Sequence, residues 1–413
     1  MIPWIVDLIG TESPVRVLGY ITVRAAGALL LAFVLSLLFG PAVIRALRRL
    51  KLGQPILTLT HRENAVDLSE MHRGKAGTPT MGGALILIAI IVPAFLFCRL
   101  GNPLVWMLIV LTLSLAGVGW LDDYRKVTQQ NSRGLLPRYK IASQALIGIL
   151  LGAGLLLLPD SMQPSYQRRV TPAEAAELMA TRGSAVEINE PDEPAMAFSD
   201  TPLRAVIRGH GYVMVPFFKS AYPHLGGLFL LWAMTVIVAS SNAVNLTDGL
   251  DGLAIGVTTM VAVFLVVVAY VVARPLLAAY LIVPTVPGAS EVAVLLACVI
   301  GASMGFLWFN AHPAEVFMGD VGSLMLGGLL GGIALTLKME LVLVIVGAVF
   351  VIETLSVIIQ VGGYKLTGRR VFRMAPIHHH FEKLGLHESK IIARFWIVAA
   401  LAALFGLATL KLR

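Results

Sequence analysis

Ten long apolar segments leave this chain few folds that it can adopt. A membrane-spanning helix needs about 20 mostly apolar residues. Of the 413 residues, 57% are hydrophobic and only 14% are charged, whereas soluble domains have about 45–50% apolar residues. We therefore predict an all-α, polytopic integral membrane protein, with ten transmembrane helices in a single domain over residues 1–413. The expected helices are Ile21–Pro41, Thr80–Phe97, Pro103–Leu121, Ile141–Leu158, Leu225–Val244, Leu253–Ala273, Glu291–Phe309, Ser323–Leu337, Leu341–Val361 and Ile391–Leu410.

Lysine and arginine are distributed unevenly between the two sides of these helices. Eighteen of them fall on one side, in Arg45–Lys75, Arg125–Lys140 and Lys365–Lys390, against seven in the short segments of the other side. The basic side of a membrane protein is cytoplasmic, so both termini are expected on the opposite, external side. The same bias explains the net charge of +8 without a nucleic-acid partner. Because Met1–Gly10 lacks the basic region of a signal peptide, the first apolar segment is expected to be retained.

One connection is much longer than the others. Residues 161–211 form a polar insertion between the fourth and fifth helices, which we expect to be a partly disordered periplasmic excursion and not a catalytic domain. Within it, Thr171–Glu174 is similar to a capping box with proline at N1, and it predicts a short helix through Met179.

Five polar clusters interrupt the apolar pattern, and all five fall on the expected cytoplasmic side. Ionisable groups at the ends of membrane helices are functional-site hypotheses by default, because their burial is costly. Random scatter would place some of the clusters on the other side. They are Lys75–Gly83, Asp122–Lys140, Asn242–Gly252, Asn310–Gly322 and Pro376–Glu382.

Three of these clusters supply aspartates. Asp122 and Asp123 end the third helix, where acidic groups oppose the helix dipole, so a merely solvated helix end gains nothing from them. Adjacent carboxylates suit Mg²⁺, or a general base beside a metal. Asp248 and Asp251 share a face if their segment is helical. Asp320 lies near the start of the eighth helix, where a simple capping role also stays open.

The other clusters allow more than one interpretation. Lys75–Gly83 is a plausible anion site, but it lacks the order of a Walker A motif. Phe317 could stack on a base or anchor at the membrane interface. Three consecutive histidines, His378–His380, rarely reach one metal together, so contacts to phosphate or sugar hydroxyls fit them better than a zinc site. Glu353, inside the ninth helix, is expected to face the bundle in a structural hydrogen bond.

Together the clusters predict phosphoryl transfer. Five aspartates share one membrane face with basic and histidine clusters. A metal would neutralise pyrophosphate charge, basic groups would hold other oxygens, and a carboxylate would take the proton of the acceptor. We therefore predict a magnesium-dependent site that handles a nucleotide-sugar and an acceptor phosphate at headgroup level.

The motifs resemble those of the phospho-N-acetylmuramoyl-pentapeptide transferase family, within the polyprenyl-phosphate N-acetylhexosamine-1-phosphate transferase superfamily. The similar segments span nearly the whole chain, and Met374–His380 resembles this branch in particular. The one departure is the long segment near residues 161–211. The matching segments are Gly77–Gly83, Asp122–Lys126, Asn242–Gly252, Phe306–Ser323 and Phe372–Phe381.

The resemblance implies that UDP-N-acetylmuramoyl-pentapeptide and undecaprenyl phosphate react to give lipid I and UMP, with Mg²⁺ as cofactor and a homodimer as the assembly. It implies Asp320 as metal ligand, with Asp248 nearby as a second, and Asp122 as the base toward the lipid phosphate, with Asp123 beside it. It also implies a substrate-binding set, which comprises Lys75, Thr80, Asn245, Asp248, Asp251, Phe317, Gly319, His378, His379 and His380.

Two other functions remain open at this point. A UDP-N-acetylglucosamine-1-phosphate transferase of the same superfamily would keep the chemistry and change the sugar, and the histidine run argues against it. A transporter or flippase of an anionic substrate would place its site near the bilayer midplane, often with repeat symmetry. Here the polar clusters lie at helix ends and no repeat is evident.

Overall fold

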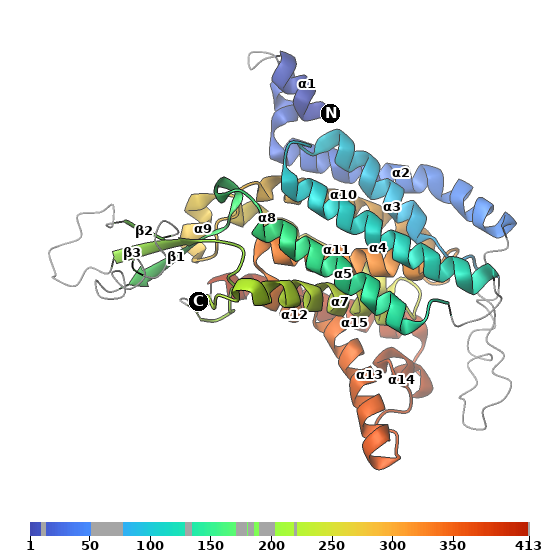
Figure 1. Ribbon diagram of the computed structural model, residues 1–413. Helices are drawn as coiled ribbons and strands as arrows, with labels where there is room; N and C mark the ends of the chain where they lie inside the picture. Colours follow the sequence, from blue (N-terminus) through green and yellow to red (C-terminus); the bar gives the residue numbers. More distant parts are fainter. Residues whose placement is uncertain are drawn as a thin grey trace.

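The computed structural model describes residues 1–9, 14–50, 77–128, 134–170, 180, 186–189, 203–218 and 221–411 (Figure 1). Within these ranges, nine helices are long and apolar enough to cross a membrane. This is the pattern of a polytopic membrane protein. The nine helices are α2 (Ile21–Arg49), α4 (Pro103–Thr128), α5 (Pro137–Leu156), α7 (Phe229–Thr247), α8 (Leu253–Val272), α10 (Ala289–Asn310), α11 (Gly319–Leu337), α13 (Ala348–Thr367) and α15 (Glu388–Lys411).

Shorter elements complete the helical part. The predicted second transmembrane helix is the 15-residue apolar helix α3 (Gly83–Phe97). The remaining short helices are α1 (Ile2–Ile9), η1 (Pro14–Gly19), η3 (Asp160–Met162), η5 (Gly226–Leu228), α9 (Pro275–Leu281), α12 (Glu340–Val346) and α14 (Ile377–Lys383).

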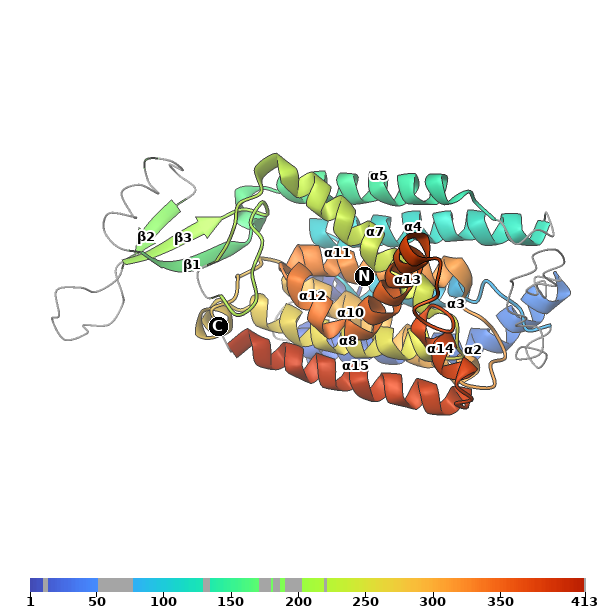
Figure 2. The same ribbon diagram turned by 90° about the horizontal axis from the view of Figure 1, so that it is seen from below.

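Helix α11 lies at the centre of the bundle, and every residue of its apolar window is buried inside the protein. It packs mainly against α4 and α7, while the neighbouring α10 packs against α2 and α8 (Figure 2). A helix buried on all sides must present small residues wherever a neighbouring backbone comes close.

Glycines provide these close contacts at the end of the bundle where α11 begins. A Cβ on Gly119 of α4 would meet the carbonyl oxygen of Asp320 and lie 2.6 Å from the Cα of Val321. A Cβ on Gly83 of α3 would meet the backbone of Gly322. The first turn of α11 is therefore held against the backbones of α3 and α4.

The ninth predicted helix, Leu341–Val361, is not continuous. Its sequence forms α12 and α13, which are separated at Gly347 (φ −86°, ψ 24°). Both halves are apolar, so hydropathy alone could not reveal the break. Helix α13 leaves the bundle at an angle and carries α14 with it (Figure 1).

The prediction of an all-α chain is wrong in the long insertion. Strands β1 (Ser165–Val170), β3 (Leu203–Arg208) and β2 (Val186–Asn189) form an antiparallel sheet in the order β1-β3-β2. The strands are short and lie within a polar insertion, so the composition of the whole insertion suggested disorder. The predicted capping box Thr171–Glu174 lies outside the described residues.

A buried polar network joins this insertion to the bundle. The Lys338 ammonium donates to the carbonyl oxygen of His210 at 3.0 Å and to Glu340 at 2.7 Å. The backbone N–H of His210 donates to Gln163 at 2.9 Å. Burial and, to a lesser degree, the nearby Lys338 charge hold the pKa of His210 well below its usual value, which favours the neutral ring.

The glycine contact between α4 and α11 yields a stability prediction. Gly119→Val should destabilise the fold by about 1–3 kcal/mol, because the added side chain overpacks against the backbone of α11. Thermal unfolding of the purified variant in detergent measures this. Gly117→Val is the matched control, since a Cβ on Gly117 meets no atom within 4 Å. Equal melting temperatures for the two variants would contradict the prediction.

Candidate active site

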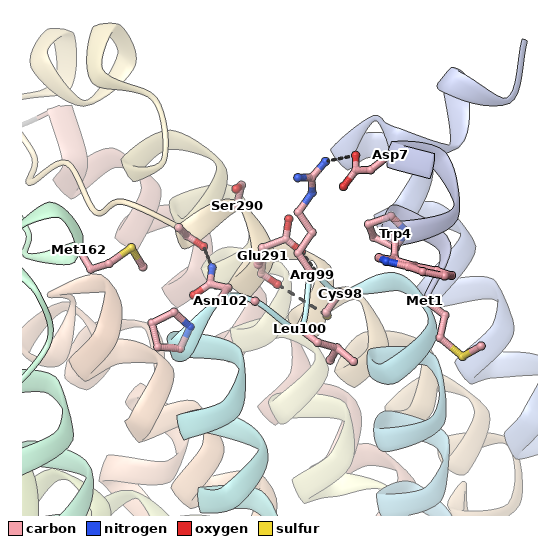
Figure 3. Close-up of a pocket in the computed structure, with 14 residues that line it drawn as sticks. Met1, Trp4, Asp7, Cys98, Arg99, Leu100, Asn102, Met162, Ser290 and Glu291 are labelled. Atoms are coloured by element: carbon pink, nitrogen blue, oxygen red, sulfur yellow. Dashed lines mark hydrogen bonds and ion pairs between the residues drawn. The ribbon is translucent and has the colours of Figure 1, made fainter. Parts of the chain in front are cut away.

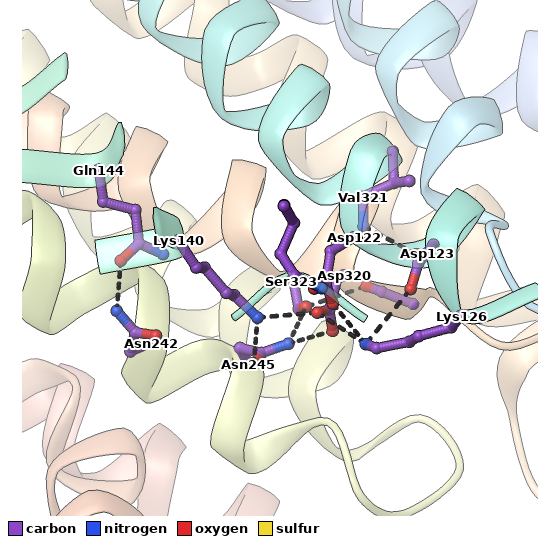
Figure 4. Close-up of polar contacts among 12 residues, drawn as sticks. Asp122, Asp123, Lys126, Lys140, Gln144, Asn242, Asn245, Asp320, Val321 and Ser323 are labelled. Atoms are coloured by element: carbon purple, nitrogen blue, oxygen red, sulfur yellow. Dashed lines mark hydrogen bonds and ion pairs between the residues drawn. The ribbon is translucent and has the colours of Figure 1, made fainter. Parts of the chain in front are cut away.

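Three buried carboxylates meet where α4 ends and α11 begins. Asp122 and Asp123 lie on α4 and are each 3% exposed, and Asp320 on α11 is 9% exposed (Figure 4). One oxygen from each carboxylate lies within 4.8 Å of the others. The structure thus brings together the three aspartates that sequence reasoning placed at the catalytic centre.

Two ammonium groups reach this acidic triad. Lys126 lies one helical turn after Asp122, and its Nζ is 2.5 Å from Asp122 and 2.9 Å from Asp320. Lys140, on α5, is 2.7 Å from the same Asp320 oxygen. Sequence reasoning did not assign a role to either lysine. The i,i+4 spacing could have identified Lys126, but nothing in the sequence connects Lys140 with Asp320.

Neutral groups fix the orientation of each carboxylate. The amide of Asn245 donates to Asp320 at 2.7 Å and to the Ser323 hydroxyl at 2.8 Å. The backbone N–H of Val321 donates to Asp123 at 3.2 Å, and that of Leu135 donates to Asp122 at 2.7 Å. The adjacent residues Asp122 and Asp123 are therefore oriented by different segments of the chain.

Gly319 occupies a position that allows only glycine. Its φ is +70°, a conformation that other residues rarely adopt. A Cβ there would lie 2.6 Å from the Asp123 carboxylate and 2.8 Å from the Thr80 hydroxyl. Thr80 is predicted to lie at the substrate rim, and it is only 6% exposed. It lies close to the triad, because the same Gly319 position contacts both Thr80 and Asp123.

A second polar group joins three segments that are distant in the sequence. Asp251 accepts hydrogen bonds from the backbone N–H of Ala314 and lies 3.1 Å from the His312 ring. Glu388, at the start of α15, lies 3.5 Å from His312 and accepts the backbone N–H of Asp251. Of these residues the sequence singled out only Asp251. His312 falls inside the predicted polar cluster Asn310–Gly322, whereas Glu388 belongs to none of the predicted polar clusters.

The three consecutive histidines point to three different partners. His378 of α14 is fully buried and contacts Glu353 at 3.0 Å, which confirms that Glu353 is buried with a hydrogen-bond partner. The other face of the His378 ring lies against Gly249, which has no side chain to block it. His379 contacts Glu382 at 2.6 Å, and His380 accepts the backbone N–H of Arg373. They do not converge on one metal ion.

The remaining predicted residues lie around the triad in different ways. Phe317 is half-buried, and its backbone pairs with Pro79 and Gly82. Asp248 is half-buried at the C-terminal cap of α7 and is not a member of either carboxylate group found among the described residues. Lys75 lies outside the described residues.

The donor set of the triad fits a divalent cation. All three ligands are carboxylates, which are the hard oxygen donors that such ions prefer. They are buried together, and their mutual repulsion requires positive charge nearby. Asp122, Asp123 and Asp320 are the residues that would hold the ion, and the two lysines would stand beside it.

Comparison with known proteins gives the family. A model described as glycosyl transferase family 4 matches residues 198–338, and a model described as phospho-N-acetylmuramoyl-pentapeptide-transferase signature 1 matches residues 75–87. A phospho-N-acetylmuramoyl-pentapeptide-transferase of Citrifermentans bemidjiense is 43% identical over 398 residues, which is 96% of each chain. The chain belongs to the phospho-N-acetylmuramoyl-pentapeptide transferase family. This confirms the resemblance deduced from the motifs.

The two local matches account for part of the family site. The signature at residues 75–87 contains Thr80, and the range 198–338 contains Asn245, Gly319 and Asp320. The two matched ranges therefore include both helices of the α3–α11 contact described above.

The triad geometry predicts which aspartates control metal affinity. Asp320→Asn should weaken Mn²⁺ binding at least about tenfold, because it removes a buried charged ligand. Electron paramagnetic resonance titration of the purified protein measures free Mn²⁺ directly. Asp7→Asn, an exposed carboxylate at the opposite end, is the control. Asp248→Asn should also leave the affinity unchanged, and an equal loss in this variant would restore Asp248 as a ligand.

Proposed function

We propose that this family member transfers phospho-N-acetylmuramoyl-pentapeptide from its UDP-activated form to undecaprenyl phosphate, giving lipid I and UMP. This would be the first membrane step of peptidoglycan synthesis. The observation that carries the proposal is the buried triad of Asp122, Asp123 and Asp320 with two lysines. It is the charge arrangement that transfer between two phosphorylated substrates requires, in a chain with the family's full-length similarity.

The proposed reaction needs no covalent enzyme intermediate. An oxygen of the lipid phosphate attacks the phosphorus next to the sugar, the pyrophosphate P–O bond breaks, and UMP leaves. Asp122 takes the acceptor's proton, while Lys126 and Lys140 hold phosphate oxygens. Asp122, Asp123 and Asp320 would hold Mg²⁺, which when bound would neutralise the pyrophosphate charge. Direct attack is favoured because the deprotonated lipid phosphate is already a nucleophile.

The other predicted residues form the proposed substrate surface. Asn245, which already bonds to Asp320, belongs to the nucleotide and metal neighbourhood together with Gly319. Phe317 has a half-buried ring suited to stacking on a base. The remaining members of the proposed substrate set are Lys75, Thr80, Asp248, Asp251, His378, His379 and His380, of which His378 is buried behind the surface against Glu353.

The proposed topology has ten transmembrane helices, with α3 as the tenth, in a bacterial inner membrane. The active site faces the cytoplasm and both termini face the periplasm, as does the insertion at residues 161–211. Two contacts support a common side for the termini, away from the triad. The Met1 amino group donates to the Phe95 carbonyl at the end of α3, and Lys411 donates to Tyr280 beyond the end of α8. By family resemblance, the assembly is a homodimer.

Substrate choice separates the proposal from its alternatives. The purified chain with Mg²⁺ and undecaprenyl phosphate should release UMP from UDP-N-acetylmuramoyl-pentapeptide, and at least about a hundredfold less from UDP-N-acetylglucosamine, because binding energy from the peptide is used in the transition state. Coupled detection of UMP measures both rates. Turnover only with UDP-N-acetylglucosamine would favour the other branch of the superfamily. Lipid flipping without UMP would favour a transporter.

The Asp320→Ala variant tests whether the triad is the catalytic centre. Its Mg²⁺-dependent turnover should fall at least about a thousandfold, because a ligand that stabilises transition-state charge is lost. Size-exclusion elution and the melting temperature serve as controls for folding. Turnover near that of the unsubstituted protein would remove Asp320 from the mechanism.

The topology predicts which surface cysteines react from outside the cell. The exposed substitutions Leu8→Cys and Leu276→Cys should label with a membrane-impermeant maleimide on intact spheroplasts. Leu366→Cys, at the end of α13, should label only after permeabilisation. The two native cysteines are buried and give little background. The reverse labelling pattern would invert the proposed orientation.

A further inference from the structure

A cationic cavity lies at the end of the bundle opposite the acidic triad. It has a volume of about 600 Å³ and lies where α2 and α10 begin and α8 ends. Three arginines line it, Arg24, Arg99 and Arg274, and its only carboxylate among the described residues is Glu291. A second cavity of about 750 Å³ adjoins it under α1 and shares Arg99, Ser290 and Glu291 (Figure 3).

One of the three arginines is buried and makes only structural contacts among the described residues. Arg24 is 2% exposed and forms a bidentate pair with Glu291, with N···O distances of 2.6 and 2.8 Å. Its guanidinium also donates to the carbonyl oxygens of Phe97 and Gly19. Arg24 and Glu291 both line the cavity. Because their opposite charges cancel, the pair adds no net charge to the cavity.

The other two arginines give the cavity its charge. Arg99 is half exposed, and among the described residues it pairs with Asp7 at 3.3 Å in an exposed contact, which contributes little stability. The guanidinium of Arg274 lies 3.4 Å above the ring of Tyr270 and donates to the Tyr270 carbonyl oxygen. Two cationic groups with unused donors therefore face one cavity, together with the hydroxyl-bearing residue Ser290.

Apolar surface continues from this cavity along two helices. On α8, the exposed residues Val263, Val267 and Tyr270 follow one helical face that ends at the cavity. On α2, Leu30 and Val34 follow Thr22 of the cavity wall at helical spacing. Both helices pack on α10, so the two apolar stripes run along the bundle from one charged opening.

From these features, we propose that the cavity binds the phosphate of an anionic phospholipid between Arg99 and Arg274, with the acyl chains lying along the stripes of α2 and α8. Guanidinium groups hold phosphate by charge-assisted hydrogen bonds. Tyr270 is suited to the polar–apolar boundary, where aromatic side chains gather at membrane interfaces. The apolar stripes beside the cavity favour a lipid over free phosphate, because free phosphate has no acyl chains to contact them.

Native mass spectrometry of the full-length chain in detergent tests this assignment. The unsubstituted protein should retain phosphatidylglycerol in preference to phosphatidylcholine. Arg99→Gln and Arg274→Gln should each lower the apparent affinity for phosphatidylglycerol about tenfold, because each removes charge-assisted hydrogen bonds. Arg16→Gln is the matched control, since Arg16 is exposed at the same end, bonds to Tyr20 and does not line the cavity.

Three outcomes would overturn the assignment. The first is equal retention of phosphatidylglycerol by the Arg99, Arg274 and Arg16 variants. The second is equal retention of both lipids by the unsubstituted protein. The third is displacement of the lipid by excess inorganic phosphate, which would identify a free-anion site. Melting temperatures confirm that the variants are folded, and the binding measurement does not depend on transferase activity.

Discussion

The close backbone contact of α11 with α3 and α4 is the constraint on which the rest of the site depends. Asp320 belongs to a helix that is buried on every side, and the glycine at position 119 lets its backbone lie against α4. Without side chains between the helices, the carboxylates of α4 and α11 come within reach of one another. Their charge is then balanced inside the protein by lysines from two helices, as the low dielectric surroundings require.

The helical part of the fold could largely be predicted, because a membrane-spanning helix must be long, apolar and internally hydrogen-bonded. The failures have physical causes. The break at Gly347 separates two apolar segments, so it leaves no trace in hydropathy. The sheet pairs the polar strand Ser165–Val170 with the more apolar Leu203–Arg208. The register of these two strands depends on pairing between segments about 40 residues apart in the sequence.

The sequence predicted the carboxylates of the candidate site, but it did not predict the side chains that contact them. Asp122, Asp123 and Asp320 stood out because charge is rare at the ends of apolar helices. Lys140 and Glu388 did not, because their partners are distant in the sequence and only the packing of α5 and α15 brings them near. The sequence of three consecutive histidines suggested one cluster of side chains. Helical geometry turns consecutive side chains to different faces. His378 therefore contacts Glu353, whereas His379 contacts Glu382.

Lys126 and Lys140, which contact the acidic triad, would also affect how a cation binds to it. Three carboxylates and two ammonium groups leave one formal negative charge, so the acidic group is already nearly neutral. A divalent ion held by the three carboxylates would compete with the ammonium groups for the Asp320 oxygen that they share. A monovalent ion would gain less Coulomb energy from this competition, so the two lysines would favour an ion of higher charge.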